Sequence, residues 1–194
     1  MPDQTLLPVH LTLLRHGQTT WNDTGTVQGQ RDVARLTEHG RHQAFDAAQR
    51  LRGVPFDALI SSDLTRAVDS AAIIADVLGL EVETTAALRE RSFGVAEGHP
   101  VAELDPRLTG ISAHRVVDSH ARPLGGESID DVYRRTTAFV SALAHERPGQ
   151  RLLLVTHGGA IHTIRAFAHA TPVEGLEWDP VENCSIWPLE VCAF

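Results

Sequence analysis

The feature that most constrains the fold is the alternation of short apolar runs with longer amphipathic segments along 194 residues. The run Val9 to Leu14 ends abruptly in Arg-His-Gly, which is typical of a buried strand that meets a turn. From Leu36 to Arg52, apolar and alanine positions recur at helical spacing, with Thr37 as a suitable N-cap and Gly53 as a stop. The chain is therefore expected to begin with a strand followed by a helix.

The same unit recurs downstream, and residues 93 to 126 form the one long stretch without a regular pattern. Ser61-Ser62-Asp63 is expected to cap the helix from about Leu64, and Ser128 with Asp131 forms a capping box. Because parallel neighbours need crossover helices, the alternation predicts a single domain over residues 1–194. The expected class is α/β, a three-layer α/β/α sandwich with a mainly parallel central sheet and helices on both faces. Further strands are expected at Phe56 to Ile60, Glu81 to Thr85, Arg151 to Thr156 and Cys184 to Val191, and further helices at Leu64 to Leu78, Ser128 to Glu146 and Ala160 to Ala170.

Charge and composition exclude several classes of function. A net charge of −8 without a basic run argues against nucleic-acid binding, and no segment approaches the roughly 20 apolar residues of a membrane span. Cys184 and Cys192 lack zinc or disulfide spacing, so a reduced, cytoplasmic protein is expected. All 17 basic residues are arginine, which excludes lysine chemistry. Any anion chemistry must therefore use arginine, histidine and backbone amides.

Arginine and histidine follow the predicted strands at the edge where parallel sheets bind ligands. Arg15-His16-Gly17 follows the first strand, Ser61-Ser62 leads to Arg66 after the second, and Thr156-His157-Gly158 follows a later one. Two imidazoles and two guanidinium groups are what a phosphate dianion requires. No carboxylate stands at metal-ligand spacing beside either histidine, so we expect neither a metal nor a cofactor. Taken singly, Arg15 fits a surface charge and His157 a core histidine equally well.

The stretch Leu14-Arg15-His16-Gly17-Gln18-Thr19-Thr20-Trp21-Asn22 resembles the signature of the histidine phosphatase superfamily, also called the phosphoglycerate-mutase-like family. The resemblance covers nearly the whole chain, with matching blocks in the family's order. These blocks are Gln28-Gly29, Leu36-Thr37-Glu38-His39-Gly40, Ser61-Ser62 with Arg66-Ala67, Leu88-Arg89-Glu90 with Phe93-Gly94, Glu97-Gly98, Gly125-Gly126-Glu127-Ser128, Val155-Thr156-His157-Gly158 and Asn183-Cys184-Ser185.

The resemblance implies roles for individual residues. His16 is implied to be the nucleophile that forms a phosphohistidine, and Glu90 to be the general acid and base. Without the resemblance, Glu90 is better interpreted as a solvated loop carboxylate. His16 must attack as a neutral imidazole, whereas His157 is expected to be cationic. The non-bridging phosphoryl oxygens are implied to be held by Arg15, Arg66 and His157.

Further contacts to the phosphate or the substrate are expected from five positions. Asn22 is implied to add a donor to the phosphoryl oxygens, and Ser62 is a secondary candidate because helix amides near it could face phosphate. The others are Gln28, Gly29 and Gly158.

The family contains hydrolases and mutases, and a noncatalytic phospho-ligand module is a third possibility. Only residues 99–126 separate Gly98 from Glu127, which leaves little chain to shield a phosphoenzyme from water, so hydrolysis is expected. The segment Asp105 to Pro123 is either a recognition loop for an acidic leaving group or a solvated loop. Its cationic residues are Arg107, His114, Arg115, His120 and Arg122. The expected partner is a small phosphate monoester, bound by a monomer or homodimer.

Overall fold

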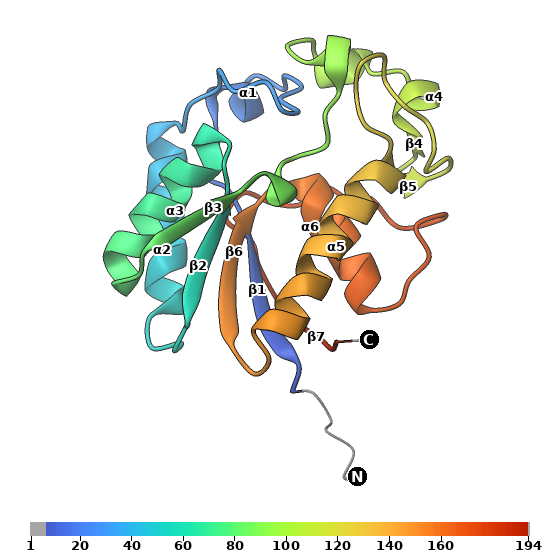
Figure 1. Cartoon of the computed structure of the whole chain (residues 1–194). Coiled ribbons are helices and arrows are strands. Elements are labelled where there is room, and N and C mark those ends of the chain that lie inside the picture. The colour runs from blue at the N-terminus through green and yellow to red at the C-terminus, as the bar shows by residue number, and fades with distance from the viewer. Residues whose placement is uncertain (1–6, 194) are drawn as a thin grey trace, which may run out of the picture.

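The computed structural model describes residues 7–193 and contains a central five-stranded sheet in the order β3-β2-β6-β1-β7 (Figure 1). The strands β1, β2, β3 and β6 are mutually parallel wherever they pair, and β7 runs antiparallel to β1 at one edge. The predicted mainly parallel sheet is therefore confirmed. The strands are β1 (Val9–Arg15), β2 (Ala58–Ser62), β3 (Val82–Thr85), β6 (Arg151–Thr156) and β7 (Ile186–Val191).

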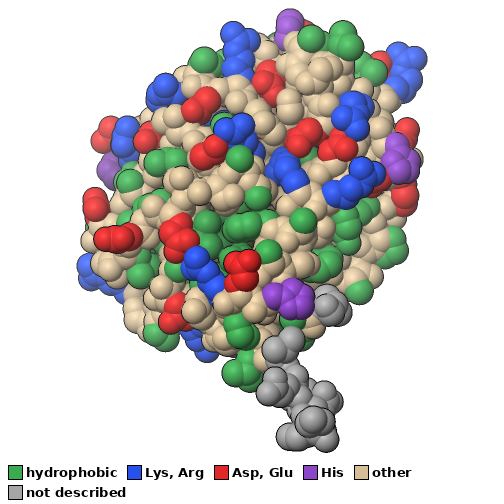
Figure 2. Space-filling view, viewed as in Figure 1, with side chains coloured by type: hydrophobic (Ala, Val, Ile, Leu, Met, Phe, Trp, Pro, Cys, Tyr) green, Lys and Arg blue, Asp and Glu red, His purple; other side chains and the backbone are tan. Residues whose placement is uncertain are grey.

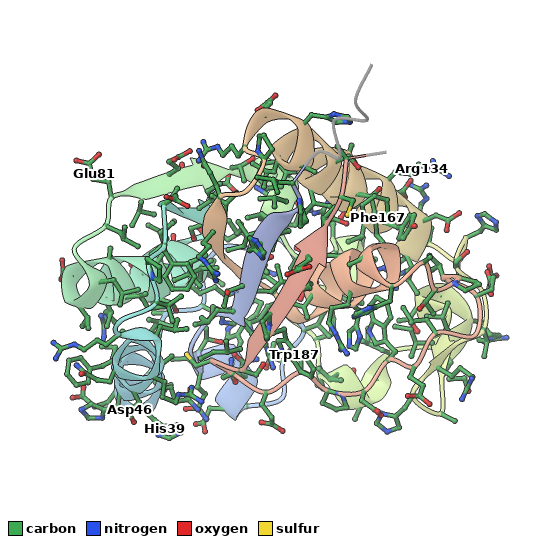
Figure 3. The ribbon with its side chains drawn as sticks, turned by 90° about the horizontal axis from the view of Figure 1, so that it is seen from below. His39, Asp46, Glu81, Arg134, Phe167 and Trp187 are labelled. Carbon is green, nitrogen blue, oxygen red and sulfur yellow. The ribbon has the colours of Figure 1, made fainter. Side chains whose placement is uncertain are left out.

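Two pairs of helices cover the two faces of this sheet. Helices α2 (Glu38–Leu51) and α3 (Thr65–Leu78) lie on one face, and α5 (Ile129–Glu146) and α6 (Gly158–Ala168) lie on the other. Seen from below in Figure 3, His39 and Asp46 mark α2 on one side of the strands, and Arg134 and Phe167 mark α5 and α6 on the opposite side. The three-layer α/β/α sandwich is confirmed.

The alternation of side chains along the central strands divides the core in two. Leu152 and Leu154 of β6 pack in the cluster that contains residues of α5 and α6. Leu153 and Val155 pack in the other cluster, with alanines of α2 and α3. Fully burying such a side chain stabilises a fold by about 1.5–3 kcal/mol, so β6 secures both layers at once.

The irregular stretch from 93 to 126, here called the rim segment, lies at the edge of the sheet where the parallel strands end (Figure 1). Arg91 secures it, because its fully buried guanidinium donates to the carbonyls of Glu127, Thr109 and Ala121. The short elements between β3 and α5 are η1 (Ala86–Leu88), η2 (Gly94–Ala96), η3 (Val101–Glu103), α4 (Pro106–Thr109), β4 (Ile111–Ser112) and β5 (Arg115–Val116).

Some details differ from the prediction. Ser61-Ser62-Asp63 does not provide the N-cap of α3, because both serines belong to β2 and the cap residue Leu64 has no side-chain bond. The short helix α1 (Thr20–Asp23) was not predicted. The capping box of Ser128 and Asp131 is confirmed at α5. Among residues 7–193, no helix is long and apolar enough to cross a membrane.

Candidate active site

Four predicted side chains lie close together at the carboxyl ends of the parallel strands. They come from the ends of β1 and β6 and from the first turn of α3. The rings of His16 and His157 lie 5.1 Å apart between centroids, and Arg66 Nε lies 3.3 Å from His16 Nε2. We call Arg15, His16, Arg66 and His157 the phosphate grip. Three of these side chains are almost fully buried, although all four are polar.

Close backbone packing fixes the position of His16. A Cβ atom on Gly17 would lie 2.3 Å from the carbonyl oxygen of Gly40, at the start of α2. Only glycine permits this approach, which explains the glycine directly after His16. Asn183 adds a second restraint, because its Nδ2 donates to the carbonyl of His16 at 2.9 Å.

The hydrogen bonds of His16 favour one tautomer. Its Nδ1 lies 2.8 Å from the carbonyl oxygen of Gly17, an acceptor, so Nδ1 carries the proton and Nε2 keeps its lone pair. Burial, followed by the charges of Arg66 and Arg15, lowers the pKa of His16 well below its usual value. The ligand-free protein therefore presents a neutral imidazole, as a nucleophile requires.

Three nitrogen atoms of the grip are buried without a hydrogen-bond partner among the described residues. They are Arg15 Nε, Arg66 Nη1 and His157 Nδ1. Other nitrogens fix both guanidinium groups, since Arg15 Nη1 donates to Val181 and Arg66 Nη2 donates to the carbonyl of Gly29 at 2.6 Å. Burial lowers the pKa of Arg66 to about 10, so its guanidinium remains cationic at neutral pH. An unsatisfied buried donor costs about 1–3 kcal/mol, and a bound anion removes that cost.

His157 differs from the expected cation. Burial, followed by Arg66 and His16, lowers the pKa of His157 well below its usual value, so both histidines are neutral in the ligand-free protein. The pKa values of both histidines are lowered, because burial and the charges of Arg66 and Arg15 act on both rings. Ser62 Oγ lies 2.9 Å from His157 Nε2, and a hydroxyl that donates there leaves the proton on Nδ1. Ser62 is thereby placed behind His157, outside the cleft.

Glu90 lies beside the grip on the loop after η1. Its carboxylate accepts hydrogen bonds from the backbone N–H of Arg91 at 2.8 Å and of Gly159 at 3.1 Å. The guanidinium of Arg135 holds the backbone, with Nη2 2.9 Å from the Glu90 carbonyl. The carboxylate of Glu127 accepts hydrogen bonds from Arg135 Nε and from the backbone N–H of Ser92. The loop that carries Glu90 is therefore held in place by hydrogen bonds on two sides.

A cleft of about 200 Å³ opens onto Arg15, His16, Arg66 and Glu90, whereas His157 lies beside His16 and is not in its lining. Asn22, Gln28 and Gly29 line it, whereas Ser62 and Gly158 do not. The Asn22 side-chain oxygen accepts from the hydroxyl of Thr19, so its amide nitrogen is the group that can donate to an anion. The lining residues are Arg15, His16, Asn22, Thr26, Val27, Gln28, Gly29, Arg66, Glu90, Phe93, Val101 and Leu104.

Sequence reasoning gave no role to Gly159 or Val181, which hold Glu90 and Arg15 through backbone atoms. Main-chain donors and acceptors leave no side-chain signal, so no motif identifies them. Asn183 did carry a signal, since it belongs to the Asn183-Cys184-Ser185 block of the resemblance. The left-handed φ of 54° at Cys184 marks the turn that presents this block to β1.

The arginines and histidines of the segment Asp105 to Pro123 all lie beside carboxylates, and none lines the cleft. The structure favours the solvated loop over the recognition loop for an acidic leaving group. The pairs are Arg107–Asp105 at 2.7 Å, His114–Asp179 at 3.5 Å, Arg115–Glu177 at 3.7 Å, His120–Asp130 at 2.8 Å and Arg122–Asp131 at 2.6 Å. Within residues 7–193, no group of three or more His, Cys, Asp or Glu side chains is arranged to hold a metal ion.

Comparison with known proteins places this geometry in a family. A probable phosphoglycerate mutase, GpmB, of Yersinia pestis is 37% identical over 175 residues, which are 90% of this chain and 81% of the relative. A mycobacterial glucosyl-3-phosphoglycerate phosphatase, solved with VO3, is 34% identical with a TM-score of 0.81, and the match covers 92% and 91% of the two chains.

A phosphoserine phosphatase mutant of Entamoeba histolytica, solved with phosphoserine, is 27% identical with a TM-score of 0.79, and the match covers 94% of each chain. The family model of the histidine phosphatase superfamily, branch 1, matches residues 11–192. The chain belongs to the histidine phosphatase superfamily.

Proposed function

We propose that this chain is a phosphomonoesterase that hydrolyses small phosphate monoesters through a phosphohistidine on His16, without a metal ion. The observation that carries the proposal is the set of three unpartnered, buried nitrogen atoms of Arg15, Arg66 and His157 around His16. Phosphatases among the solved relatives, including the one with phosphoserine, support the class of reaction. We further propose that the whole chain is one domain that acts in the cytoplasm.

In the first step, His16 Nε2 attacks phosphorus and the bond to the ester oxygen breaks. The Arg66 Nε–H that now faces this nitrogen at 3.3 Å turns to a phosphoryl oxygen when the substrate enters. Arg15, Arg66 and His157 stabilise the charge on the equatorial oxygens, with Asn22 as a further donor. Glu90 gives its proton to the departing alkoxide, so the product is a neutral alcohol.

In the second step, water attacks the phosphohistidine and the P–N bond breaks. Glu90, now a carboxylate, takes one proton from the water, and His16 leaves as a neutral imidazole. The Nδ1–H of His16 stays on the Gly17 carbonyl throughout, which stabilises the positive charge that the ring carries while it is phosphorylated. The enzyme returns to its starting protonation after releasing inorganic phosphate.

The name of the Yersinia relative makes a mutase the second candidate function. A mutase must retain a bisphosphate or a phosphorylated acid while the phosphoenzyme is protected from water. Among the described residues, the only arginines that line the cleft are Arg15 and Arg66, which the first phosphoryl group engages. The arginines of the rim segment are paired with carboxylates outside the cleft, so hydrolysis is favoured over transfer back to the substrate.

The test combines trapping with a comparison of products. Turnover in EDTA should continue, and acid-labile, base-stable phosphate should be found on His16 after a rapid quench. His16→Ala should lower activity by roughly three orders of magnitude or more. Given 3-phosphoglycerate and catalytic 2,3-bisphosphoglycerate, the enzyme should release phosphate faster than it equilibrates the isomers. Activity that vanishes on chelation and returns with a divalent ion, or faster isomerisation, would contradict the proposal.

A further inference from the structure

The cleft has two chemically different ends. One end is lined by Arg15, His16 and Arg66 of the phosphate grip, and the other is bounded by Thr26, Val27, Phe93, Val101 and Leu104. Four of these five side chains are apolar. A phosphoryl group held by the grip directs the alcohol part of its ester toward this second end, which we call the alcohol pocket.

Main-chain hydrogen bonds build one wall of the alcohol pocket. Residues 25–27 pair with residues 98–101, since Val101 N–H donates to Gly25 at 2.8 Å and Val27 N–H donates to His99 at 2.9 Å. The reverse bond from Gly98 N–H to Val27 is also 2.9 Å. This part of the rim segment is therefore fixed against the loop after α1, and Val27 and Val101 keep a defined spacing.

Gly29 joins this wall to the phosphate grip. Its carbonyl accepts from Arg66, and its φ of +51° lies in the left-handed region that favours glycine. A Cβ at this position would lie 2.2 Å from Glu97 Oε1, which itself accepts from Gln30 and Phe93 N–H. These contacts therefore fix the position of the alcohol pocket relative to the phosphate grip.

The charged residues that line the cleft provide no binding partner for an alcohol that carries a carboxylate. Among the described residues, Arg15 and Arg66 are the only arginines in the lining, and both belong to the grip. The other titratable residues of the lining are His16, the proposed nucleophile, and Glu90, the proposed acid, and neither provides a positive charge for a second anion. The rim segment also exposes large apolar side chains, which are Val95, Val101, Leu108, Val117 and Leu124. Hydrophobic side chains lie at the top of Figure 2, where Figure 1 places this segment.

From this arrangement we infer that the alcohol pocket selects esters of apolar, uncharged alcohols and disfavours esters whose alcohol carries a carboxylate. The inference rests on the proposed phosphomonoesterase function. Placing a carboxylate between Val27, Val101 and Leu104 removes water from it without providing a donor. Each methylene that the pocket buries should raise kcat/KM by about two- to fourfold until the pocket is filled.

A matched series of esters tests the inference. Ethyl to hexyl phosphates are compared with esters of equal length that end in a carboxylate. The leaving alcohols differ little in acidity, so differences in kcat/KM report contacts in the pocket rather than bond strength. We expect kcat/KM to rise with alkyl length and to exceed that of the longer carboxylated partners by about tenfold or more. A flat series, or equal use of carboxylated esters, would overturn the inference.

Two variants test whether the preference for alkyl over carboxylated esters arises in the alcohol pocket. Val101→Arg places a cation in the lining and should lower the preference for alkyl over carboxylated esters by about tenfold. Leu108→Arg is the control, because Leu108 is 51% exposed on the same rim segment, close to the 53% of Val101, but does not line the cleft. It should keep the wild-type preference. An equal change in both variants would contradict a pocket at Val101.

The proposed function can fail separately from this inference. Release of phosphate from p-nitrophenyl phosphate tests the function alone, since this ester has an activated leaving group and needs little from the pocket. If no phosphate is released, the phosphomonoesterase proposal fails. If phosphate is released while the alkyl series shows no preference, only the inference about the alcohol pocket fails.

Discussion

The phosphate grip and the rim segment use charged side chains in opposite ways. In the grip, the buried guanidinium of Arg66 retains a nitrogen without a partner. In the rim segment, exposed Arg107 and half-exposed Arg122 bind nearby carboxylates. The grip thus keeps buried nitrogen atoms that an anion can bind, while the arginines of the rim segment are paired with carboxylates and its Phe93, Val101 and Leu104 line the cleft. We propose that the first region carries out the reaction and that the second selects among alcohols.

After the loss of the nucleophile itself, the largest effect should come from Glu90, which lies in the cleft between the two regions. Glu90→Gln keeps the size of the side chain but cannot transfer a proton. We therefore expect transfer from poor alkyl leaving groups to His16 to slow by about 10²- to 10⁴-fold. Aryl phosphates need less protonation, so their transfer step should slow much less. The pre-steady-state burst with each ester isolates this step from hydrolysis of the phosphohistidine.

The burst is necessary because Glu90 also serves as the proposed base of the second step. Steady-state rates can therefore fall for both esters and hide the contrast. Equal slowing of the two bursts would show that Glu90 only holds the loop, in which its carboxylate accepts from Arg91 and Gly159 N–H. The acid would then have to be sought elsewhere in the loop from Arg89 to Gly98.

A smaller but uniform loss is expected from the grip. Arg66→Gln removes a charged donor to the phosphoryl oxygens, so kcat/KM should fall by about 10²- to 10³-fold. Because the phosphoryl group is common to all esters, the loss should be the same for alkyl, aryl and carboxylated substrates. Measuring kcat/KM with all three esters therefore tests whether the grip acts on the phosphoryl group alone.

Arg107→Gln is the matched control for that measurement, since Arg107 is exposed and paired with Asp105 on the rim segment. It should retain wild-type kcat/KM with every ester. Thermal unfolding of both variants checks that the fold is intact. A loss in Arg66→Gln that varies with the alcohol would show that the grip also takes part in selecting the leaving group.

The sequence predicted the grip well and the rim segment poorly, for a physical reason. Strand ends are specified by strong local signals, such as the apolar run before Arg15 and the one before His157, and parallel pairing then brings these ends together. The rim segment is organised by distant backbone bonds, such as Val101 N–H to Gly25, which leave no periodic pattern. Beside the grip, the contact of Ser62 with His157 was not predicted, because the two residues lie 95 positions apart in the sequence.

The charge of His157 was also not predictable from the sequence. The proposed roles predict a neutral His16 and a cationic His157, but the sequence does not reveal that both rings are buried beside the same arginines. Desolvation dominates both pKa values and lowers them together. Burial is a property of the assembled fold, so the neutral state of His157 became visible only in the structure.

The smallest predicted effect follows from this burial and concerns stability. In the unfolded chain the imidazoles of His16 and His157 titrate near pH 6.5, whereas in the folded protein their pKa values lie well below that. As pH falls, the unfolded state binds protons first, so stability is present above pH 6.5 and is lost in acid. Between pH 7.5 and 5.5, each histidine that stays neutral should cost about 1.4 kcal/mol of the free energy of unfolding.

Urea unfolding of the ligand-free protein at these two pH values measures the loss. His16→Gln removes one buried imidazole and should reduce the difference between the two pH values by about 1.4 kcal/mol. His99→Gln is the control, because His99 is exposed on the rim segment and its ring remains in water in both states. It should keep the wild-type difference. Stopping at pH 5.5 keeps most carboxylates ionised, so the change reports histidines. A wild-type free energy that does not change between pH 7.5 and 5.5 would show that the grip binds protons as readily as the unfolded chain, and the neutral nucleophile would have to arise only when substrate binds.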